Sequence, residues 1–318
     1  MFIGVGAVAG VALLGWLAAV ALQDGAVTPV EALGAPRFVD ESAGIDHVYD
    51  GEFTFFVGGG IAVFDCDDNQ LPDLYLAGGA NPASLHRNTG RAGAPLQFTP
   101  VPSQATDLTS VTGAYPIDID GDGITDLAVL RLGENVLLKG TGDCRFEPAN
   151  EEWSVGGGEA WTVGFSATWE NSDSLPTLAF GNYIQLDENG QQFGGCSDNV
   201  LVRPTPGGAS YADAIELAPG WCTLSTLFSD WNRTGSADLR ITNDRHYYRD
   251  GEEQLWRIEA GEAPRLYTRD EGWQKMQIWG MGIASYDVTG DGLPEVLLTS
   301  QADNKLQTLT DGSDGPNY

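Results

Sequence analysis

A short acidic segment recurs along this chain at a nearly constant interval. Its copies read DCDDNQLPDL, DIDGDGITDL, DWNRTGSADL and DVTGDGLPEV, and they begin at Asp65, Asp118, Asp230 and Asp287. The starts are separated by 53, 112 and 57 residues, and because 112 is twice 56 a further copy is expected near residue 174. A degenerate copy, WENSDSLPTL, begins at Trp169 and has lost the first and last acidic residues. The chain is therefore predicted to consist of five repeated units of about 50–60 residues.

The residues around each acidic segment repeat as well. A run rich in small residues leads into the segment (GGGIAVF, WGMGIASY), an apolar run follows it (LYLAGG, LAVLRLG), and a leucine-containing run comes next (SLHRN, NVLLK). An aromatic residue opens each unit 19–27 residues before the acidic segment: Phe38, Phe98, Phe146, Tyr211 and Tyr267. Short strands with turn signals at a fixed period predict an all-β fold, either a β-propeller or a β-solenoid. Four strands per unit favour a β-propeller of four-stranded blades.

The acidic segments are candidate cation-binding loops between strands. An EF-hand loop needs a bidentate Glu at position 12 and helices on both sides. Counting from Asp118, position 12 is Val129, and the flanking residues are strand-like. The remaining pattern, D-x-D-x-D-G-x-x-D, offers side-chain oxygens at positions 1, 3, 5 and 9 and a backbone carbonyl at position 7. Hard cations bind clustered oxygens, and Ca²⁺ tolerates irregular loops better than Mg²⁺ does, so Ca²⁺ is the expected ion. Acidic turns without metal are the alternative.

The four loops differ in the number of carboxylates that they offer. We name them loop 65 (65–73), loop 118 (118–126), loop 230 (230–238) and loop 287 (287–295). The candidate ligands at positions 1, 3, 5, 7 and 9 are Asp118, Asp120, Asp122, Ile124 and Asp126; Asp65, Asp67, Asn69, Leu71 and Asp73; Asp287, Thr289, Asp291, Leu293 and Glu295; and Asp230, Asn232, Thr234, Ser236 and Asp238. Loop 118 is expected to be the strongest site and loop 230 the weakest, whereas the copy at Trp169 is expected to bind no ion. Gln70 stands where a glycine is usual.

The loop-between-strands pattern resembles the FG-GAP/VCBS repeats of integrin α-chain propellers. The segments GGGIAVFDCDDNQLPDLYLAGG and WGMGIASYDVTGDGLPEVLLTS are similar to bacterial relatives of cartilage acidic protein 1, the ASPIC/UnbV group. This resemblance covers residues 37–310 and implies a propeller, typically of seven blades, whose loops bind Ca²⁺ and which has no general catalytic activity. Because five units are visible, either five blades close, with the Phe38 strand completing the last one, or a larger propeller has been truncated.

The charge of the chain limits its partners. The sequence carries 45 acidic and 16 basic residues, a formal charge of −29. Such a charge repels the phosphates of nucleic acids and of anionic lipids, which excludes nucleic acid as an expected ligand. Four bound Ca²⁺ ions would leave most of this charge in place. The excess therefore indicates a surface suited to salty surroundings or to a basic partner.

The N-terminal segment predicts export. Residues 2–22 carry no charge, and as a helix they would span about 30 Å, roughly the thickness of a bilayer core. Ala19, Val20 and Ala21 form an A-x-A-like cleavage site. Residues 1–24 are therefore predicted to be either a transmembrane anchor helix or a removed signal peptide, followed by a linker at 25–36 and the propeller at 37–318. Both readings place the acidic body on the periplasmic or extracellular face.

Four cysteines are compatible with two disulfides in an exported chain. Three pairings are open for Cys66, Cys144, Cys196 and Cys222. We favour Cys66–Cys144 and Cys196–Cys222 because these pairings close the shorter loops. None of the cysteines has CxxC spacing, which argues against a zinc or redox site.

No catalytic motif accompanies these features, and the protein is not expected to be an enzyme. His47, His86 and His246 have no companions at metal or triad spacing in the sequence. Three functions remain open. The first is a calcium-stabilised, exported scaffold for protein binding or cell adhesion. The second is an accessory subunit of a membrane complex, held by residues 2–22 and docking through the propeller. The third is a glycan-binding or glycan-cleaving propeller.

Overall fold

The computed structural model describes residues 35–42, 44–170, 175–187, 192–244, 250–309, 315–316 and 318. The chain divides into one unit of residues 1–40 and a second unit of residues 41–318. The predicted anchor or signal segment and most of the linker lie outside the described residues. Among the residues that are described, no helix is long and apolar enough to cross a membrane. The strand expected at Phe38 is not formed: residues 35–40 contain no strand, and Phe38 is 92% exposed.

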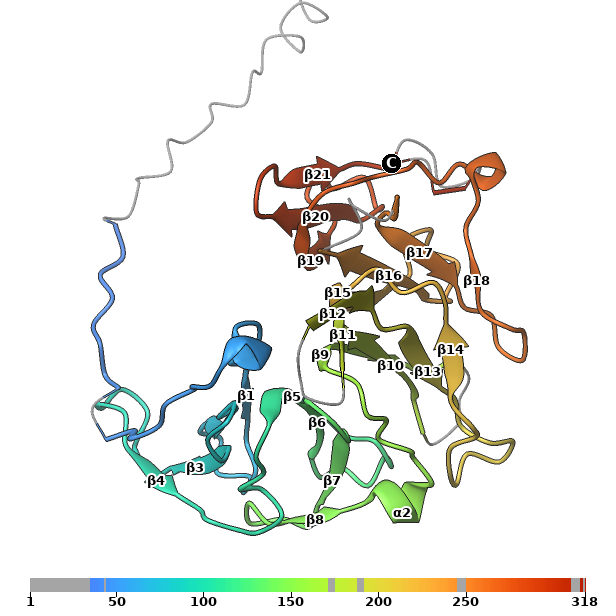
Figure 1. Cartoon of the computed structure of the whole chain (residues 1–318). Coiled ribbons are helices and arrows are strands. Elements are labelled where there is room, and N and C mark those ends of the chain that lie inside the picture. The colour runs from blue at the N-terminus through green and yellow to red at the C-terminus, as the bar shows by residue number, and fades with distance from the viewer. Residues whose placement is uncertain are drawn as a thin grey trace, which may run out of the picture. The chain divides into compact units, whose positions relative to one another are not determined.

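Residues 41–318 form antiparallel sheets, one for each of the five sequence units (Figure 1). Sheet 1 contains β1 (Ile61–Phe64), β2 (Asp73–Leu76), β3 (Ser84–Asn88) and β4 (Phe98–Pro100). Sheet 2 contains β5 (Val111–Ile117), β6 (Asp126–Arg131), β7 (Val136–Gly140) and β8 (Phe146–Pro148). Sheet 3 contains β9 (Thr162–Thr168), β10 (Thr177–Asn182), β13 (Asn199–Val202) and β14 (Ile215–Leu217).

The remaining two repeat sheets follow the same plan. Sheet 4 contains β15 (Thr223–Ser229), β16 (Asp238–Asn243), β17 (Gln254–Arg257) and β18 (Arg265–Leu266), and sheet 5 contains β19 (Gly280–Tyr286), β20 (Glu295–Ser300) and β21 (Lys305–Gln307). A small sheet pairs β11 (Ile184–Leu186) with β12 (Gln192–Cys196). The described helices are single turns: η1 (Phe53–Phe55), α2 (Asn150–Trp153) and η3 (Arg269–Glu271).

Each sheet is offset from the sequence repeat by one strand. The aromatic residue that opens the second unit, Phe98, lies in β4 and pairs with Asn88 at the outer edge of sheet 1. Phe146 likewise lies in β8, which pairs with β7 at the edge of sheet 2. A sheet therefore consists of the last three strands of one unit and the opening strand of the next. Sheet 5 has three strands among the described residues.

The cores lie between successive sheets. In sheets 1 to 4 the second strand is largely buried on both faces, as in β6, where Leu127 and Val129 face the cluster shared with sheet 1, and Ala128 and Leu130 face the cluster shared with sheet 3. This arrangement explains why the runs after loops 65 and 118 are nearly continuously apolar rather than alternating. In sheet 5, β20 leaves Leu297 exposed. The first strands contact one another in order, β1 with β5, β5 with β9, β9 with β15 and β15 with β19. In the described part of the chain, no strand pairing joins sheet 1 to sheet 5.

Both favoured disulfides are confirmed. Cys66 in loop 65 is bonded to Cys144 between β7 and β8, so this bridge joins sheets 1 and 2. Cys196 in β12 is bonded to Cys222, which directly precedes β15. Two disulfides indicate an oxidising, exported environment.

In sheets 2, 3 and 5 an asparagine at the start of the third strand closes the end of the sheet opposite the acidic loop. The side-chain Oδ1 atoms of Asn135, Asn199 and Asn304 accept hydrogen bonds from backbone N–H groups at the end of the second strand, at 2.9, 2.8 and 3.0 Å. In sheet 4 a glutamate takes this place: Glu253 Oε1 accepts the N–H of Asn243 at 3.2 Å. Glu253 is fully buried, its Oε2 has no hydrogen-bond partner among the described residues, and burial holds the pKa of its carboxyl well above the usual range.

Candidate cation-binding loops

Each acidic segment forms the tight loop of a β-hairpin, as the sequence predicted. In all four loops, position 1 directly follows the first strand of the sheet and position 9 begins the second strand. The pairs Phe64–Asp73, Ile117–Asp126, Ser229–Asp238 and Tyr286–Glu295 face each other at the base of the hairpins. The same positions of the loop therefore occupy the same place in each sheet.

The carboxylate at position 1 holds the loop backbone together. In each loop it accepts a hydrogen bond from the backbone N–H at position 6, from Gln70 at 2.7 Å, Gly123 at 3.0 Å, Gly235 at 2.9 Å and Gly292 at 2.9 Å. Positions 4 and 6 have positive φ in all four loops. Glycine adopts this conformation without strain, which explains its presence at position 6 of three loops. Gln70 adopts it too, with a φ of +67°.

The carboxylate at position 9 links the loop to the third strand. Asp126 is fully buried and accepts the N–H of Ile119 at 2.7 Å and the N–H of Gly140, in β7, at 2.8 Å. Asp73 makes the same two contacts, with Cys66 at 2.8 Å and with Asn88 in β3 at 2.7 Å. Burial raises the pKa of Asp126 to about 6, and the neighbouring loop carboxylates add to the shift. Each of these buried carboxylates joins the loop backbone to the third strand by hydrogen bonds. Each also lies close to the other carboxylates of its loop.

Three carboxylates converge in each of two loops. Oxygens of Asp65, Asp67 and Asp73 lie within 4.8 Å of one another, and so do oxygens of Asp118, Asp120 and Asp126. Asp122, the fourth predicted carboxylate of loop 118, lies outside this triplet, and its Oδ1 accepts the N–H of Ile124 at 2.8 Å. Among the described residues of loop 287, Asp287, Asp291 and Glu295 form no such triplet.

The donors in loops 65 and 118 fit a hard divalent cation. The Oδ1 atom of Asp67 is shielded from solvent and has no hydrogen-bond partner among the described residues, so one oxygen of this carboxylate is available to an ion. Basic side chains of the third strand offset part of the charge: Arg87 Nε lies 3.2 Å from Asp67 Oδ2, and Lys139 Nζ lies 2.5 Å from Asp120 Oδ2. Clustered carboxylate oxygens with an unpaired lone pair are the environment that Ca²⁺ prefers.

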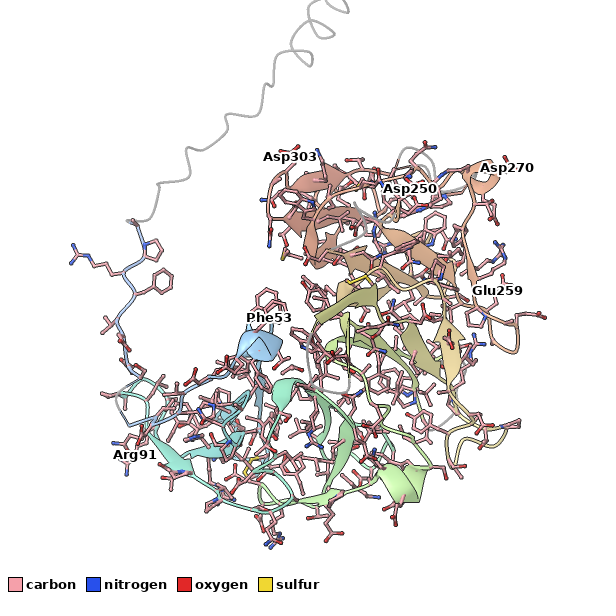
Figure 2. The ribbon with its side chains drawn as sticks, viewed as in Figure 1. Phe53, Arg91, Asp250, Glu259, Asp270 and Asp303 are labelled. Atoms are coloured by element: carbon pink, nitrogen blue, oxygen red, sulfur yellow. A yellow bond between two sulfur atoms is a disulfide. The ribbon has the colours of Figure 1, made fainter. Side chains whose placement is uncertain are left out.

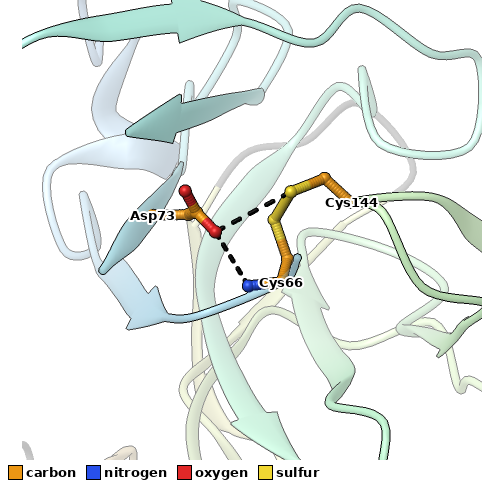
Figure 3. A group of neighbouring side chains, drawn as sticks. All are labelled: Cys66, Asp73 and Cys144. Atoms are coloured by element: carbon orange, nitrogen blue, oxygen red, sulfur yellow. Dashed lines mark hydrogen bonds between the residues drawn. A yellow bond between two sulfur atoms is a disulfide. The ribbon is translucent and has the colours of Figure 1, made fainter. Parts of the chain in front are cut away.

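A second acidic grouping near loop 65 is not a metal site. Asp73 lies beside Cys66 and Cys144, and both residue types bind metals elsewhere (Figure 3). The two sulfurs are joined in a disulfide, and neither is a thiolate that could bind an ion. The 3.7 Å approach of Cys144 Sγ to Asp73 Oδ2 is a contact without a proton, because a disulfide sulfur carries none.

In the degenerate copy at Trp169, the positive charge is that of a side chain of the protein, Arg203. Arg203 follows β13 at the register that Arg87 and Lys139 occupy in sheets 1 and 2. Its Nε donates to Glu170 Oε1 at 2.7 Å, and Thr177 at position 9 donates to the same oxygen at 2.6 Å. Both charged side chains are largely buried. Asn171 and Asp173, which this copy retains, lie outside the described residues.

Two histidines that appeared unrelated in the sequence are joined in space. Ser84 Oγ lies 2.9 Å from His47 Nδ1 and 2.9 Å from His86 Nε2. His47 Nε2 lies 2.7 Å from the carbonyl oxygen of Ala77, so it donates its proton there and leaves Nδ1 to accept the serine hydroxyl. Neither histidine has a companion at metal or triad spacing in the sequence, and Ser84 joins the two only in the fold. The segment before β1 folds back onto sheet 1, and no periodicity in the sequence predicts this contact. His246 lies outside the described residues.

The comparisons with known proteins agree with this geometry. The family model of the FG-GAP-like repeat matches residues 65–129, which contain loops 65 and 118. No curated protein matches the chain. Repeated antiparallel sheets of four strands, with an acidic loop between the first two strands, are consistent with the blades of a propeller.

Proposed function

We propose that this protein is an exported, calcium-binding β-propeller of the FG-GAP type, related to the ASPIC/UnbV group, and that it serves as a scaffold for binding another protein. The observation that carries the proposal is the carboxylate triplet that recurs at the same register of sheets 1 and 2. Two equivalent loops that gather three carboxylates, within the segment that matches the FG-GAP-like repeat, support a shared cation-binding role rather than two unrelated acidic turns.

Ca²⁺ would be held by Asp65, Asp67 and Asp73 in loop 65 and by Asp118, Asp120 and Asp126 in loop 118. The ion would supply the charge that neutralises these side chains, and its role would be structural. The buried position 9 carboxylates already join each loop to the third strand. A bound ion would extend this bracing to positions 1 and 3.

The acidic surface of the sheets supports the proposed scaffold role. Acidic side chains such as Asp250, Asp270 and Asp303 lie at the periphery of the sheets (Figure 2). A protein partner with a basic contact surface would be attracted to this surface, and the attraction would weaken as salt screens it. The partner, whether an adhesion ligand or a subunit of a membrane complex, would dock on the faces between the loops.

A calcium titration tests the metal sites. We expect Ca²⁺ to raise the melting temperature of the purified protein and EDTA to reverse the change. The double variant Asp67→Asn/Asp120→Asn, which removes one carboxylate from each triplet, should lose most of this response. Asp270→Asn, which removes the same kind of charge at an exposed position outside the loops, should retain it. An unchanged melting temperature in the wild type, with no calcium uptake by calorimetry, would contradict the proposal.

A pull-down from native cell envelopes tests the scaffold role. The wild-type protein should retain a defined partner in calcium and release it as salt is raised, and the loop double variant should retain less. Recovery of the same proteins by the wild type and by an unrelated acidic protein of similar charge would show charge attraction alone. That result would overturn the scaffold role while leaving the calcium sites intact.

A further inference from the structure

Loop 230 contains a feature that the other acidic loops lack. Residues Asn232, Arg233 and Thr234 form an N-x-T triplet without proline, and no other Asn in the 318-residue sequence is followed by Ser or Thr at this spacing without an intervening proline. This triplet is the acceptor motif for N-linked glycans, and it is meaningful only on the surface of an exported protein. The two disulfides indicate that this chain is exported.

The structure places the triplet where a modifying enzyme can reach it. Arg233, Thr234 and the two residues that follow are exposed, and Asn232 is half-buried. Thr234 Oγ1 donates a hydrogen bond to Asn232 Oδ1 at 2.8 Å. The carbonyl side of the amide is therefore held by the threonine, whereas the Nδ2 group has no hydrogen-bond partner in the described part of the chain.

Loop 230 also depends least on a cation. It has two carboxylates, and both are engaged by the protein. Asp230 accepts the N–H groups of Thr234 and Gly235, each at 2.9 Å. Asp238 accepts hydrogen bonds from Trp231 Nε1 at 2.7 Å, from the Tyr267 hydroxyl at 2.8 Å and from the backbone N–H of Ile258, directly after β17, at 2.9 Å. The indole and the phenol have no counterpart in loops 65 and 118. Loop 230 therefore keeps its conformation without an ion, and Asn232 is available for another role.

We infer that Asn232 is a glycosylation site and that the glycan excludes a cation from loop 230. The donor is a lipid-linked sugar diphosphate, used by a membrane transferase of the exporting cell. The bond between Asn232 Nδ2 and the anomeric carbon forms as the bond between that carbon and the diphosphate oxygen breaks. The amide loses one proton, and the lipid diphosphate leaves. Since Asn232 occupies position 3, where Asp67 and Asp120 face their ions in the proposed function, a sugar on this side chain occupies the cation position.

Mass spectrometry of the protein purified from its own cells tests the inference. We expect the proteolytic peptide that contains Asn232 to carry a sugar mass, with fragment ions that place the mass on the asparagine. Thr234→Ala should abolish the modification, and Thr234→Ser, which keeps the hydroxyl and the motif, should restore it. An unmodified Asn232 peptide from these cells, or a sugar that persists in Asn232→Gln, would overturn the inference.

The second part of the inference, that the glycan excludes a cation from loop 230, is tested by calcium binding. Its outcome is independent of loops 65 and 118. In the double variant Asp67→Asn/Asp120→Asn, those loops no longer contribute. On this background, Asn232→Asp adds a carboxylate and removes the acceptor amide. We expect weak calcium uptake to appear at loop 230 in Asn232→Asp and to be absent in the glycosylated parent. Equal uptake by both proteins would show that glycan and cation do not compete.

Discussion

The carboxylate of Asp65 accepts a hydrogen bond from the backbone N–H of Gln70 at 2.7 Å, although Gln70 adopts a φ of +67°. The corresponding residue in each of the other three acidic loops is glycine. Loop 65 therefore has the same backbone conformation at position 6 as the other three loops, although a residue with a Cβ disfavours that conformation. The hydrogen bonds of the position 1 carboxylate impose this conformation.

Replacing Gln70 with glycine is expected to stabilise the protein. A left-handed conformation costs a residue with a Cβ about 1–2 kcal/mol, and the greater freedom of glycine in the unfolded chain cancels part of the gain. We expect Gln70→Gly to raise the free energy of unfolding by about 0.5–1 kcal/mol in urea titrations. Gly123→Ala is the matched control, because a Cβ at Gly123 meets no atom within 4 Å and adds only backbone strain. Loss of stability in Gln70→Gly would show that the side chain itself supports the loop.

Lys139→Met is expected to strengthen calcium binding in loop 118. The ammonium group lies 2.5 Å from Asp120 Oδ2, and this contact raises the pKa of Lys139 above its usual range. An incoming ion must compete with that contact. Because an ion pair that remains partly accessible to solvent contributes up to about 1 kcal/mol, its removal should raise the affinity of loop 118 by about fivefold at most. Isothermal calorimetry should show the change in loop 118 and none in loop 65, and a lower affinity would contradict competition.

Glu253→Gln is expected to flatten the dependence of stability on pH. The folded protein holds the Glu253 proton to a higher pH than the unfolded chain does, because burial raises the pKa, while Arg240 opposes the shift only in part. The stability from this group is therefore complete below the ordinary pKa of 4.5 and is lost as the pH rises through the folded pKa. Glutamine keeps the acceptor for Asn243 and carries no charge.

Urea unfolding between acidic and neutral pH measures this effect. Above the ordinary glutamate pKa, the free energy of unfolding of the wild type should fall by up to about 1.4 kcal/mol per pH unit, and that of Glu253→Gln should fall less. Glu252→Gln, which changes the neighbouring and partly exposed carboxyl, should change the slope less than Glu253→Gln does, because the charge of Glu252 is the smallest of the causes that act on the pKa of Glu253. Parallel slopes in wild type and Glu253→Gln would place the titrating group elsewhere.

The two disulfides are expected to contribute unequally. The Cys66–Cys144 bridge spans 78 residues of sequence and the Cys196–Cys222 bridge spans 26. Closing the longer loop removes more freedom from the unfolded chain, by about 1 kcal/mol in the loop-entropy model. We therefore expect the double variant Cys66→Ser/Cys144→Ser to lose more free energy of unfolding than Cys196→Ser/Cys222→Ser does. The expected loss for Cys66/Cys144 is about 4 kcal/mol. The reverse order would mean that native contacts, rather than loop entropy, set the contribution of each bridge.

The strand order and the loops could be predicted because the residues that determine them are neighbours in the sequence. Position 1 binds position 6 of its own loop, and position 9 begins the strand that follows. The favoured disulfides also followed from chain separation. The pairing of β4 with β3 could not be predicted, because an edge strand of three residues has too little pattern to show which neighbour it joins. The contacts of Ser84 with His47 and of Arg203 with Glu170 likewise depend on how distant segments fold together.

The offset between sheet and repeat affects how such a chain can be divided. Because β4 carries the opening residues of the second unit, a fragment that ends where the first unit ends would expose the edge of β3. Such an edge invites pairing with other chains. A fragment that ends between β4 and β5, in residues 101–110, would keep sheet 1 whole. Each sheet thus shares its last strand with the next sequence unit. A duplication or deletion of one repeat keeps every sheet complete only if its boundary falls after the opening strand of a unit rather than before it.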